Sequence, residues 1–295
     1  MNSERIFKSI ADEGLNQEML PMRLWQKSKQ LGTWDPTEID FSQDIEDWKN
    51  LEEPEREVLM HLTSLFLGGE ESVTNDLLPL IMAISDEGRL EEEMYLTSFL
   101  FEEAKHVEVF RRFFDEVAGS PSELDRFHGE NYRRLFHEAL PAALNRLREE
   151  PTPENQAIAS TTYNMIVEGV LAETGYHAYF STLESHEIMP GMQEVTRLLK
   201  RDESRHMAYG VFLLSRLVAE HGEPVWEAIE GRMNELLPCA IGMIEEVFDS
   251  YEVMPMGLEL DEFVGFATDQ YQKRYQRITR AREQTVAEVV GGDEL

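Results

Sequence analysis

The sequence predicts an all-α protein. Over long stretches of its 295 residues, apolar side chains recur every three or four positions, as on one face of an α-helix. No segment alternates polar and apolar residues over several positions, as a half-buried strand would. The hydrophobic content of 42% is enough for one large core, and we expect a single domain over residues 1–295.

The expected elements follow in chain order. Residues 1–50 are expected to form an N-terminal arm with short helices, and residues 53–221 the main bundle. The bundle begins at "EPE", where a proline and two acids suit the first turn of a helix, and this helix runs to about residue 78. The glycine pair at 68–69 within it indicates close packing or a local distortion.

The remaining helices are separated by two breaks, "SPSELDRF" and "REEPTPENQ". Helical periodicity predicts three further bundle helices over 87–119, 154–183 and 191–221. More helices are expected to fill 223–250 and 258–290, in a C-terminal part that spans residues 222–295.

One pattern occurs twice. "FEEAKHVEVF" contains Glu103 and His106, and "RDESRHMAYG" contains Glu203 and His206. Residues three apart lie on the same helix face, and both pairs fall on the apolar stripe of their helix. Either pair alone is equally well read as a salt-bridged or solvated patch in so acidic a chain.

Each pair is preceded by a glutamate in apolar helical surroundings, Glu70 and Glu168. The combined pattern matches the ligand set of a carboxylate-bridged dinuclear site in a four-helix bundle. Four buried glutamates would repel one another, and two cations supply the missing positive charge. An oxygen-rich site with one imidazole per metal suits iron or manganese. We expect one metal on Glu70, Glu103 and His106, the other on Glu168, Glu203 and His206, and a bridge from Glu103 or Glu203.

Other acidic and histidine side chains nearby are not expected to be ligands. Glu71 adjoins Glu70 but points about a quarter turn away. Glu173 and His177 have a ligand-like spacing, but they break the symmetry of the repeated pattern. The apolar neighbours Val73, Phe110, Met165 and Leu171 predict an apolar cavity beside the metals.

The composition excludes several classes of protein. The net charge is 27 − 58 = −31, which makes nucleic acid a poor partner. The sequence contains no run of eighteen apolar residues, so no transmembrane segment is expected. The N-terminal stretch "MNSERIFKSIADEG" lacks the apolar region of a signal peptide. The single cysteine, Cys239, fits a reducing compartment, so we expect a cytoplasmic protein.

Over roughly residues 20–220 the chain resembles the small subunit of class I ribonucleotide reductase, a ferritin-like dimetal protein. The stretch "TWDPTEIDFSQDIEDWKNLEEPEREVL" looks like the N-terminal arm of that superfamily. The resemblance implies a ferritin-like four-helix bundle core with additional helices. It also implies that Trp34 and Asp202 form a hydrogen-bonded connection toward His106.

The chain departs from the reductase subunit at three places. Phe110 stands where the radical-bearing tyrosine is expected, and Glu70 where the first ligand is often aspartate. The tail "EVVGGDEL" has no aromatic residue that could relay a radical. At these positions the chain is more similar to a sister family, the ligand-binding oxidases that resemble the ribonucleotide reductase small subunit.

That resemblance implies a Mn/Fe centre, with a di-iron pair as the alternative, that activates O₂ for two-electron oxidation of C–H bonds. It also implies an ether cross-link between Val73 and Tyr163, a pocket tyrosine at Tyr176, a bound long-chain fatty acid and a homodimer. From the residues alone, Val73 and Tyr163 are core side chains, and Tyr163 lies off the Glu168 face of an ideal helix. Two alternatives stay open: a radical-generating reductase subunit and a non-enzymatic ferritin-like metal-binding protein.

Overall fold

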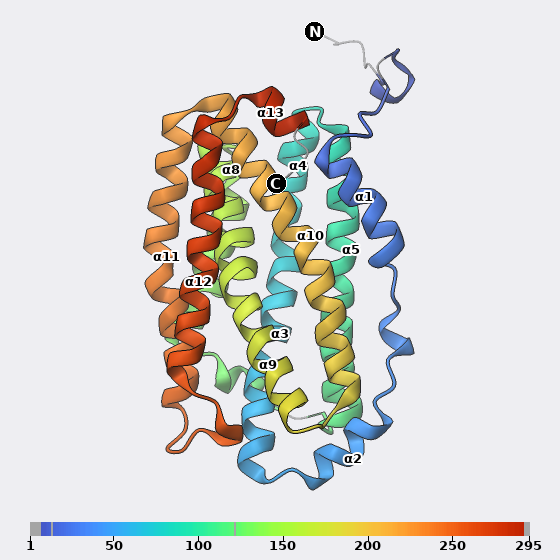
Figure 1. The fold of residues 1–295 in the computed structure, drawn as a ribbon, viewed down its shortest axis with the longest axis vertical. Helices are drawn as coiled ribbons and strands as arrows, with labels where there is room; N and C mark the ends of the chain where they lie inside the picture. The colour runs from blue at the N-terminus through green and yellow to red at the C-terminus, as the bar shows by residue number, and fades with distance from the viewer. Residues whose placement is uncertain (1–6, 13, 121, 292–295) are drawn as a thin grey trace.

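The computed structural model describes residues 7–12, 14–120 and 122–291, and the fold is built from helices (Figure 1). No strand occurs among these residues, so the all-α prediction is confirmed. The helices are α1 (Leu20–Leu31), α2 (Ser42–Asn50), α3 (Glu53–Asp76), α4 (Leu78–Asp86), α5 (Leu90–Arg112), α6 (Glu130–Tyr132), α7 (Leu140–Arg146), α8 (Pro153–Ser160), α9 (Glu173–Ser185), α10 (Pro190–His221), α11 (Glu223–Asp249), α12 (Leu260–Thr279) and α13 (Val286–Gly291). Residues 292–295 of the aromatic-free tail lie outside the described part.

Four long helical segments form the central bundle. They are α3, α5, α10 and a continuous run made of α8, a π-helix over Thr161–Ala172, and α9. In Figure 1, α1 lies along the outside of α5, and α11 and α12 cover the opposite side of the bundle. The short helices α2 and α13 lie at opposite ends of the molecule.

The helix α3 begins where the sequence predicts, because its first turn is capped. Glu52 and Glu55 form a reciprocal capping box, and a proline occupies the first turn. The predicted continuation to residue 78 is slightly too long: α3 ends at Asp76, and α4 follows from Leu78.

The glycine pair within α3 serves close packing, and the helix continues through it. A Cβ atom on Gly68 would lie 2.5 Å from the hydroxyl oxygen of Tyr132, and one on Gly69 would lie 3.4 Å from the ring of Phe136. Both aromatic residues belong to the helical stretch over 130–146, which the sequence analysis leaves unassigned. A side chain at Gly68 would push this stretch away from the bundle.

The start of α10 is fixed by carboxylates of α2. The buried Asp44 carboxylate accepts hydrogen bonds from the backbone amides of Gly191 and Met192, at 2.9 and 2.8 Å. The Asp47 carboxylate accepts one from the amide of Met189 at 2.7 Å. These are the amides that a helix N-terminus leaves unpaired, and negative charge is favourable there. The arm thereby sets the position of α10, which carries Glu203 and His206.

The π-helix over Thr161–Ala172 changes which residues share a face. Its wider turns bring residues five positions apart closer to the same side than an α-helix does. Tyr163 and Glu168 have this spacing, and both side chains reach the carboxylate cluster. In an ideal α-helix Tyr163 would lie off the Glu168 face, as predicted from the sequence, and the π-helix brings it closer to that face.

The interior side chains form two buried apolar clusters. The larger cluster includes Val73, Phe99 and Tyr163, and the smaller includes Phe110 and Tyr176. The polar residues described below lie in the middle of the bundle, where residues of both clusters adjoin them. In the described part of the chain, no helix combines the length and apolar character needed to cross a membrane.

Candidate metal centre

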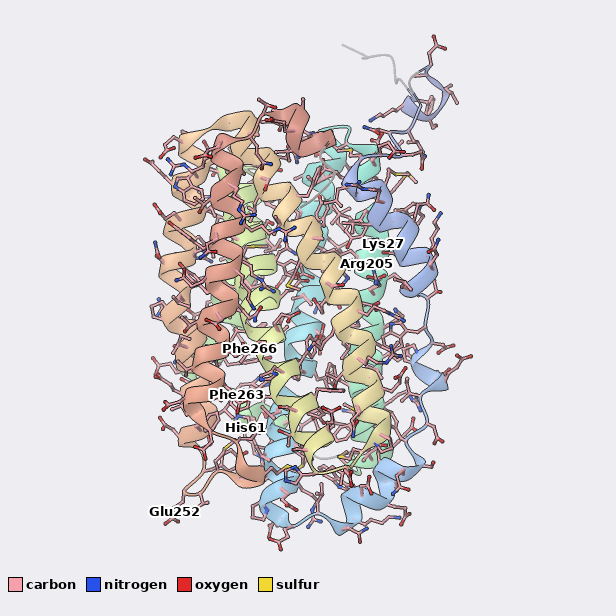
Figure 2. All side chains as sticks on the ribbon, viewed as in Figure 1. Lys27, His61, Arg205, Glu252, Phe263 and Phe266 are labelled. Carbon is pink, nitrogen blue, oxygen red and sulfur yellow. The ribbon has the colours of Figure 1, made fainter. Side chains whose placement is uncertain are left out.

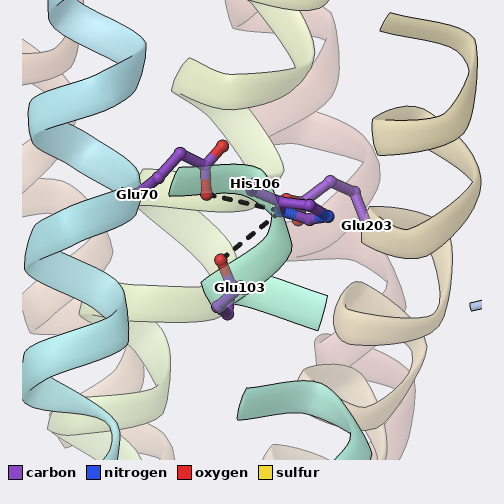
Figure 3. Close-up of side chains that lie close together, drawn as sticks. All are labelled: Glu70, Glu103, His106 and Glu203. Atoms are coloured by element: carbon purple, nitrogen blue, oxygen red, sulfur yellow. Dashed lines mark ion pairs between the residues drawn. The ribbon is translucent and has the colours of Figure 1, made fainter. Parts of the chain in front are cut away.

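The six predicted ligands converge on one point inside the bundle, from all four of its long segments. One group of ligand atoms comes from Glu70, Glu103, His106 and Glu203, and a second from Glu103, Glu168, Glu203 and His206; within each group all these atoms lie within 4.8 Å of one another. Figure 3 shows the first group. Glu103 and Glu203 belong to both groups, so both carboxylates are placed to bridge two ions.

The first group is centred on the imidazole of His106. Its Nδ1 atom lies 3.4 Å from a carboxylate oxygen of Glu70, 3.6 Å from one of Glu103 and 3.5 Å from one of Glu203. The dashed lines in Figure 3 mark the first two of these contacts. The side chains come from α3, α5 and α10, so the site depends on the packed bundle.

The second group has the same arrangement around His206. Its Nδ1 atom lies 3.1 Å from Glu103, 3.5 Å from Glu168 and 3.4 Å from Glu203, each measured to a carboxylate oxygen. All six side chains are buried, and the most exposed of them, Glu70, retains only 6% of its accessible surface. Bulk water therefore does little to solvate four acidic groups.

The donor atoms of this cluster fit a pair of divalent ions. Of the buried side-chain atoms without a hydrogen-bond partner among the described residues, five belong to the ligand groups: Glu103 Oε2, His106 Nδ1, Glu168 Oε1, Glu203 Oε2 and His206 Nδ1. Buried polar atoms are nearly always paired in native proteins, so these atoms call for another partner. Carboxylate oxygens and imidazole nitrogens are the ligands that manganese and iron accept.

The electrostatics of the four carboxyl groups and two imidazoles point the same way. Burial raises the pKa of Glu70 to about 8, against the opposing effect of His106. Burial, reinforced by the neighbouring Glu203 carboxylate, raises the pKa of Glu168 well above its usual range. The two imidazoles outweigh burial at Glu103 and hold the pKa of that carboxyl well below its usual range. Bound cations would keep all four carboxylates ionised.

The predicted connection from Trp34 to His106 is present in the structure. The indole Nε1 of Trp34 donates to Asp202 Oδ2 at 2.7 Å, and the same oxygen lies 3.4 Å from Nε2 of His106. The ammonium of Lys105 also reaches this oxygen at 3.2 Å and donates to the backbone carbonyl of Gly32 at 2.6 Å. Such an outer carboxylate orients a metal-bound imidazole and fixes its tautomer.

A matching outer contact exists at the second histidine, and the sequence analysis missed it. Nε2 of His206 lies 2.9 Å from Glu102 Oε2, and the guanidinium of Arg205 donates to Glu102 at 2.7 Å and to Asp202 at 2.5 Å. The signal was present in the sequence, because the repeated pattern begins one residue earlier, with an acid, and has a cation immediately before each histidine. It reads acid-Glu-x-cation-His in both "EEAKH" and "DESRH".

Three further side chains hold the ligand carboxylates in place. The phenol of Tyr163 donates to Glu103 at 2.9 Å, and that of Tyr176 donates to Glu70 at 3.0 Å. The amide of Asn164, which the sequence analysis did not single out, donates to Glu168 at 2.9 Å. Asn164 packs directly on Gly210 of α10, where a Cβ atom would lie 2.3 Å from the asparagine Cβ.

An apolar cavity opens from the carboxylate cluster toward α11 and α12. Glu70, Glu103, Glu168 and Glu203 contribute to its wall at one end, together with Val73. The rest of the wall is almost entirely apolar and includes Phe66, Phe136, Val167, Leu171, Met243, Val247, Phe248, Met254, Leu258 and Phe263. Phe263 is marked in Figure 2 on α12. Of the four residues predicted to line an apolar cavity, Val73 and Leu171 do line this one. Phe110 and Met165 are buried elsewhere in the core.

The residues rejected as ligands lie away from the cluster. Glu71 is exposed on α3. The imidazole of His177 stacks on Phe266 and lies 3.2 Å from Glu262 of α12. Neither Glu173 nor His177 belongs to the two ligand groups.

Comparisons with known proteins agree with this geometry. Residues 21–275 match the family model of the ribonucleotide reductase small chain. A variant R2-like ligand-binding oxidase with an anaerobically reconstituted Mn/Fe cofactor is 35% identical over 94% of this chain and 100% of its own, with a TM-score of 0.88.

Two more solved structures are similar to nearly the whole chain. The R2-like ligand-binding oxidase from Sulfolobus acidocaldarius is 39% identical over 97% of this chain and 98% of its own, with a TM-score of 0.88. A variant with an aerobically reconstituted Mn/Fe cofactor is 34% identical over 94% and 99% of the two chains, with a TM-score of 0.90. The chain therefore belongs to the ribonucleotide reductase small chain family and, within it, to the R2-like ligand-binding oxidases.

Proposed function

We propose that this protein is an O₂-dependent oxidase that uses a Mn/Fe pair held by the six converging residues to oxidise C–H bonds by two electrons. The observation that carries the proposal is the position of the carboxylate cluster at one end of an apolar cavity. When bound, the metals supply the sites and electrons for dioxygen activation. The protein's own residues hold, orient and shield them.

The roles of the protein residues follow from their contacts. Glu103 and Glu203 each belong to both ligand groups and would fix the separation of the two ions. Asp202 and Glu102 hold the imidazoles of His106 and His206 in one orientation. The apolar wall of the cavity excludes water from the reacting positions, which limits wasteful side reactions.

The first C–H bond that we propose for oxidation is the protein's own. Val73 lies in the cavity wall beside Glu70, and the Tyr163 phenol is held on Glu103. An ether between the Val73 side-chain carbon and the Tyr163 oxygen forms with loss of one C–H and one O–H hydrogen. The O₂-oxidised metal pair would take up two electrons and two protons would be released, so the linked peptides weigh two hydrogens less than their sum.

A tryptic digest of protein reduced, loaded with manganese and iron, and then exposed to air tests this step. We expect a joined peptide carrying Val73 and Tyr163. The joined peptide should be absent from an anaerobic sample and from Tyr163→Phe, which still has all six metal ligands. Separate peptides at unmodified masses in the aerated wild type would refute the cross-link.

The cavity lining supports a long-chain fatty acid as the ligand. A carboxylate head would meet the metals at the polar end, and the hydrocarbon tail would contact the apolar wall. Mass spectrometry of an organic extract of the purified protein should find about one fatty acid per chain. An extract without stoichiometric lipid would count against this assignment.

The oxidase proposal can be separated from a radical-generating reductase subunit. Phe110 is buried and stacks on Phe66 at 5.1 Å between ring centroids, so no phenol stands at that position. We expect no nucleotide reduction when the loaded protein is mixed with a reductase large subunit from the same cell. Turnover in that assay would favour the reductase subunit. Homodimer formation and cytoplasmic location remain predictions.

A further inference from the structure

A line of aromatic rings leads from His206 away from the ligand cavity. The ring of Phe99 stacks on the His206 imidazole, with 3.6 Å between centroids and 11° between planes. The ring of Tyr95 follows at 6.1 Å from Phe99, and Tyr209 follows at 5.2 Å from Tyr95. All four side chains are fully buried, and none of them lines the cavity that opens from the carboxylates.

The line ends at a buried proton acceptor. The phenol of Tyr209 donates to Glu92 Oε2 at 3.1 Å, and Glu92 is itself fully buried. The other oxygen of Glu92 lies 3.3 Å from the guanidinium of Arg216. Arg216 pairs with Glu220 at 2.9 Å, and Glu220 pairs at the same distance with Arg89, which is 28% exposed. An ionic network therefore connects the Tyr209–Glu92 pair to the surface.

Packing alone does not account for phenols at these positions. The hydroxyl of Tyr95 has no hydrogen-bond partner among the described residues, although it is fully buried. Burying such a group costs stability, and phenylalanine would fill nearly the same space without that cost. Tyrosine differs from phenylalanine chemically because it gives up an electron far more readily once a base accepts its proton.

Building on the proposed oxidase function, we propose that Tyr209 is a second redox site, with Glu92 as its proton acceptor and Tyr95 as the relay toward the metals. One electron passes from the Tyr209 phenol through Tyr95 to the O₂-oxidised metal pair, which is reduced by one electron. The phenolic proton moves to the Glu92 carboxylate. The products are a neutral tyrosyl radical and a protonated Glu92, so charge and atoms balance.

The position of this pair separates it from the proposed cross-linking chemistry. Tyr163 contacts the cluster directly through Glu103, whereas Tyr209 is reached through Phe99 and Tyr95. Tyr209 would therefore be oxidised when no closer reductant is available. Such a route would carry an oxidising equivalent away from the cavity when neither substrate nor the phenols of Tyr163 and Tyr176 consume it.

The test uses full-length protein carrying both Tyr163→Phe and Tyr176→Phe, so that neither phenol that contacts a ligand carboxylate can act as reductant. The protein is loaded anaerobically with manganese and iron, mixed with O₂, frozen at increasing times and examined by electron paramagnetic resonance. Ring-deuterated tyrosine identifies a tyrosyl signal by its narrowed hyperfine structure. Dioxygen consumption is recorded on the same samples.

We expect a transient tyrosyl signal in this double variant that falls to background when Tyr209→Phe is added. The matched control adds Tyr179→Phe instead, because Tyr179 is equally buried but bonds to Thr63 outside the line of rings. The control should keep the signal. Glu92→Gln, which cannot accept the proton as a carboxylate, should weaken it.

Three outcomes would overturn the proposal. Dioxygen consumption without any tyrosyl signal would reject the redox site and leave the oxidase function intact. A signal that survives Tyr209→Phe would show that the radical resides on another tyrosine. If the loaded protein consumes no dioxygen, the oxidase function fails, and the Tyr209 site fails with it because its oxidant is missing.

Discussion

Glu102 of α5 lies 2.9 Å from the Nε2 atom of His206 on α10, so the residue before one ligand holds the histidine of the opposite helix. The reverse contact joins Asp202 of α10 to His106 of α5 at 3.4 Å. Each of the two helices therefore supplies the carboxylate that supports the histidine on the other helix. The Nδ1 atoms of both histidines are left facing the carboxylate cluster.

This arrangement predicts that the outer carboxylates control metal affinity. Glu102→Gln and Asp202→Asn keep the size of each side chain but weaken its hold on the imidazole. Each should lower metal affinity roughly 10- to 100-fold, measured by competition with a chelator of known affinity. Glu108→Gln, an exposed position on α5, is the control and should have no effect. Unchanged affinity in both outer variants would show that the carboxylates only fill space.

Removing a ligand should remove a metal. In His106→Ala or Glu203→Ala, the remaining donors cannot complete both ligand groups, so elemental analysis should find fewer than two tightly bound ions per chain. Glu71→Gln changes the exposed neighbour of Glu70 and should leave the metal content unchanged. Two tightly bound ions in both ligand variants would mean that the six residues do not form the site.

The contact between Gly210 and Asn164 predicts a linked effect on stability and metal binding. In Gly210→Ala the added Cβ would lie 2.3 Å from the Cβ of Asn164, so α10 and the π-helix must separate. We expect a loss of about 1–3 kcal/mol in the free energy of unfolding, and weaker metal binding because Asn164 supports Glu168. Gly231→Ala on α11 meets no atom within 4 Å and should leave stability equal or higher.

Most of the helices and the six-residue cluster could be predicted from the sequence because both depend on local spacing. The apolar stripe places Glu103 and His106 on one face of a helix whatever the rest of the fold does. The π-helix could not be predicted this way, since nothing in the periodicity around Tyr163 marks a widened turn. The helical stretch over 130–146 was not predicted, and its packing on Gly68 depends on the folded bundle. The contact of Glu102 with His206 required the relative position of two helices.

A buried histidine outside the metal centre predicts a pH effect on stability. Burial is the main cause that lowers the pKa of His61 from 6.5 to about 4, and the ring stacks on Phe127 and contacts the hydroxyl of Tyr251. Because the unfolded chain binds the proton more tightly, His61 contributes stability above pH 6.5 that is lost as the pH falls toward 4. Between pH 7 and pH 5 the loss should be about 2 kcal/mol.

Urea unfolding of the wild type and of His61→Gln at the two pH values measures this contribution. From pH 7 to pH 5, the unfolding free energy of the wild type should fall by about 2 kcal/mol more than that of His61→Gln. An equal pH response in both proteins would show that folding does not lower the pKa of His61.

The most direct test of the metal assignment is anomalous X-ray diffraction at the manganese and iron absorption edges, on crystals grown from protein loaded with both metals. We expect two anomalous peaks, one of each metal. One peak should lie among Glu70, Glu103, His106 and Glu203, and the other among Glu103, Glu168, Glu203 and His206. Two peaks of the same metal would contradict the Mn/Fe pair, and the absence of anomalous density among these residues would contradict the metal centre itself.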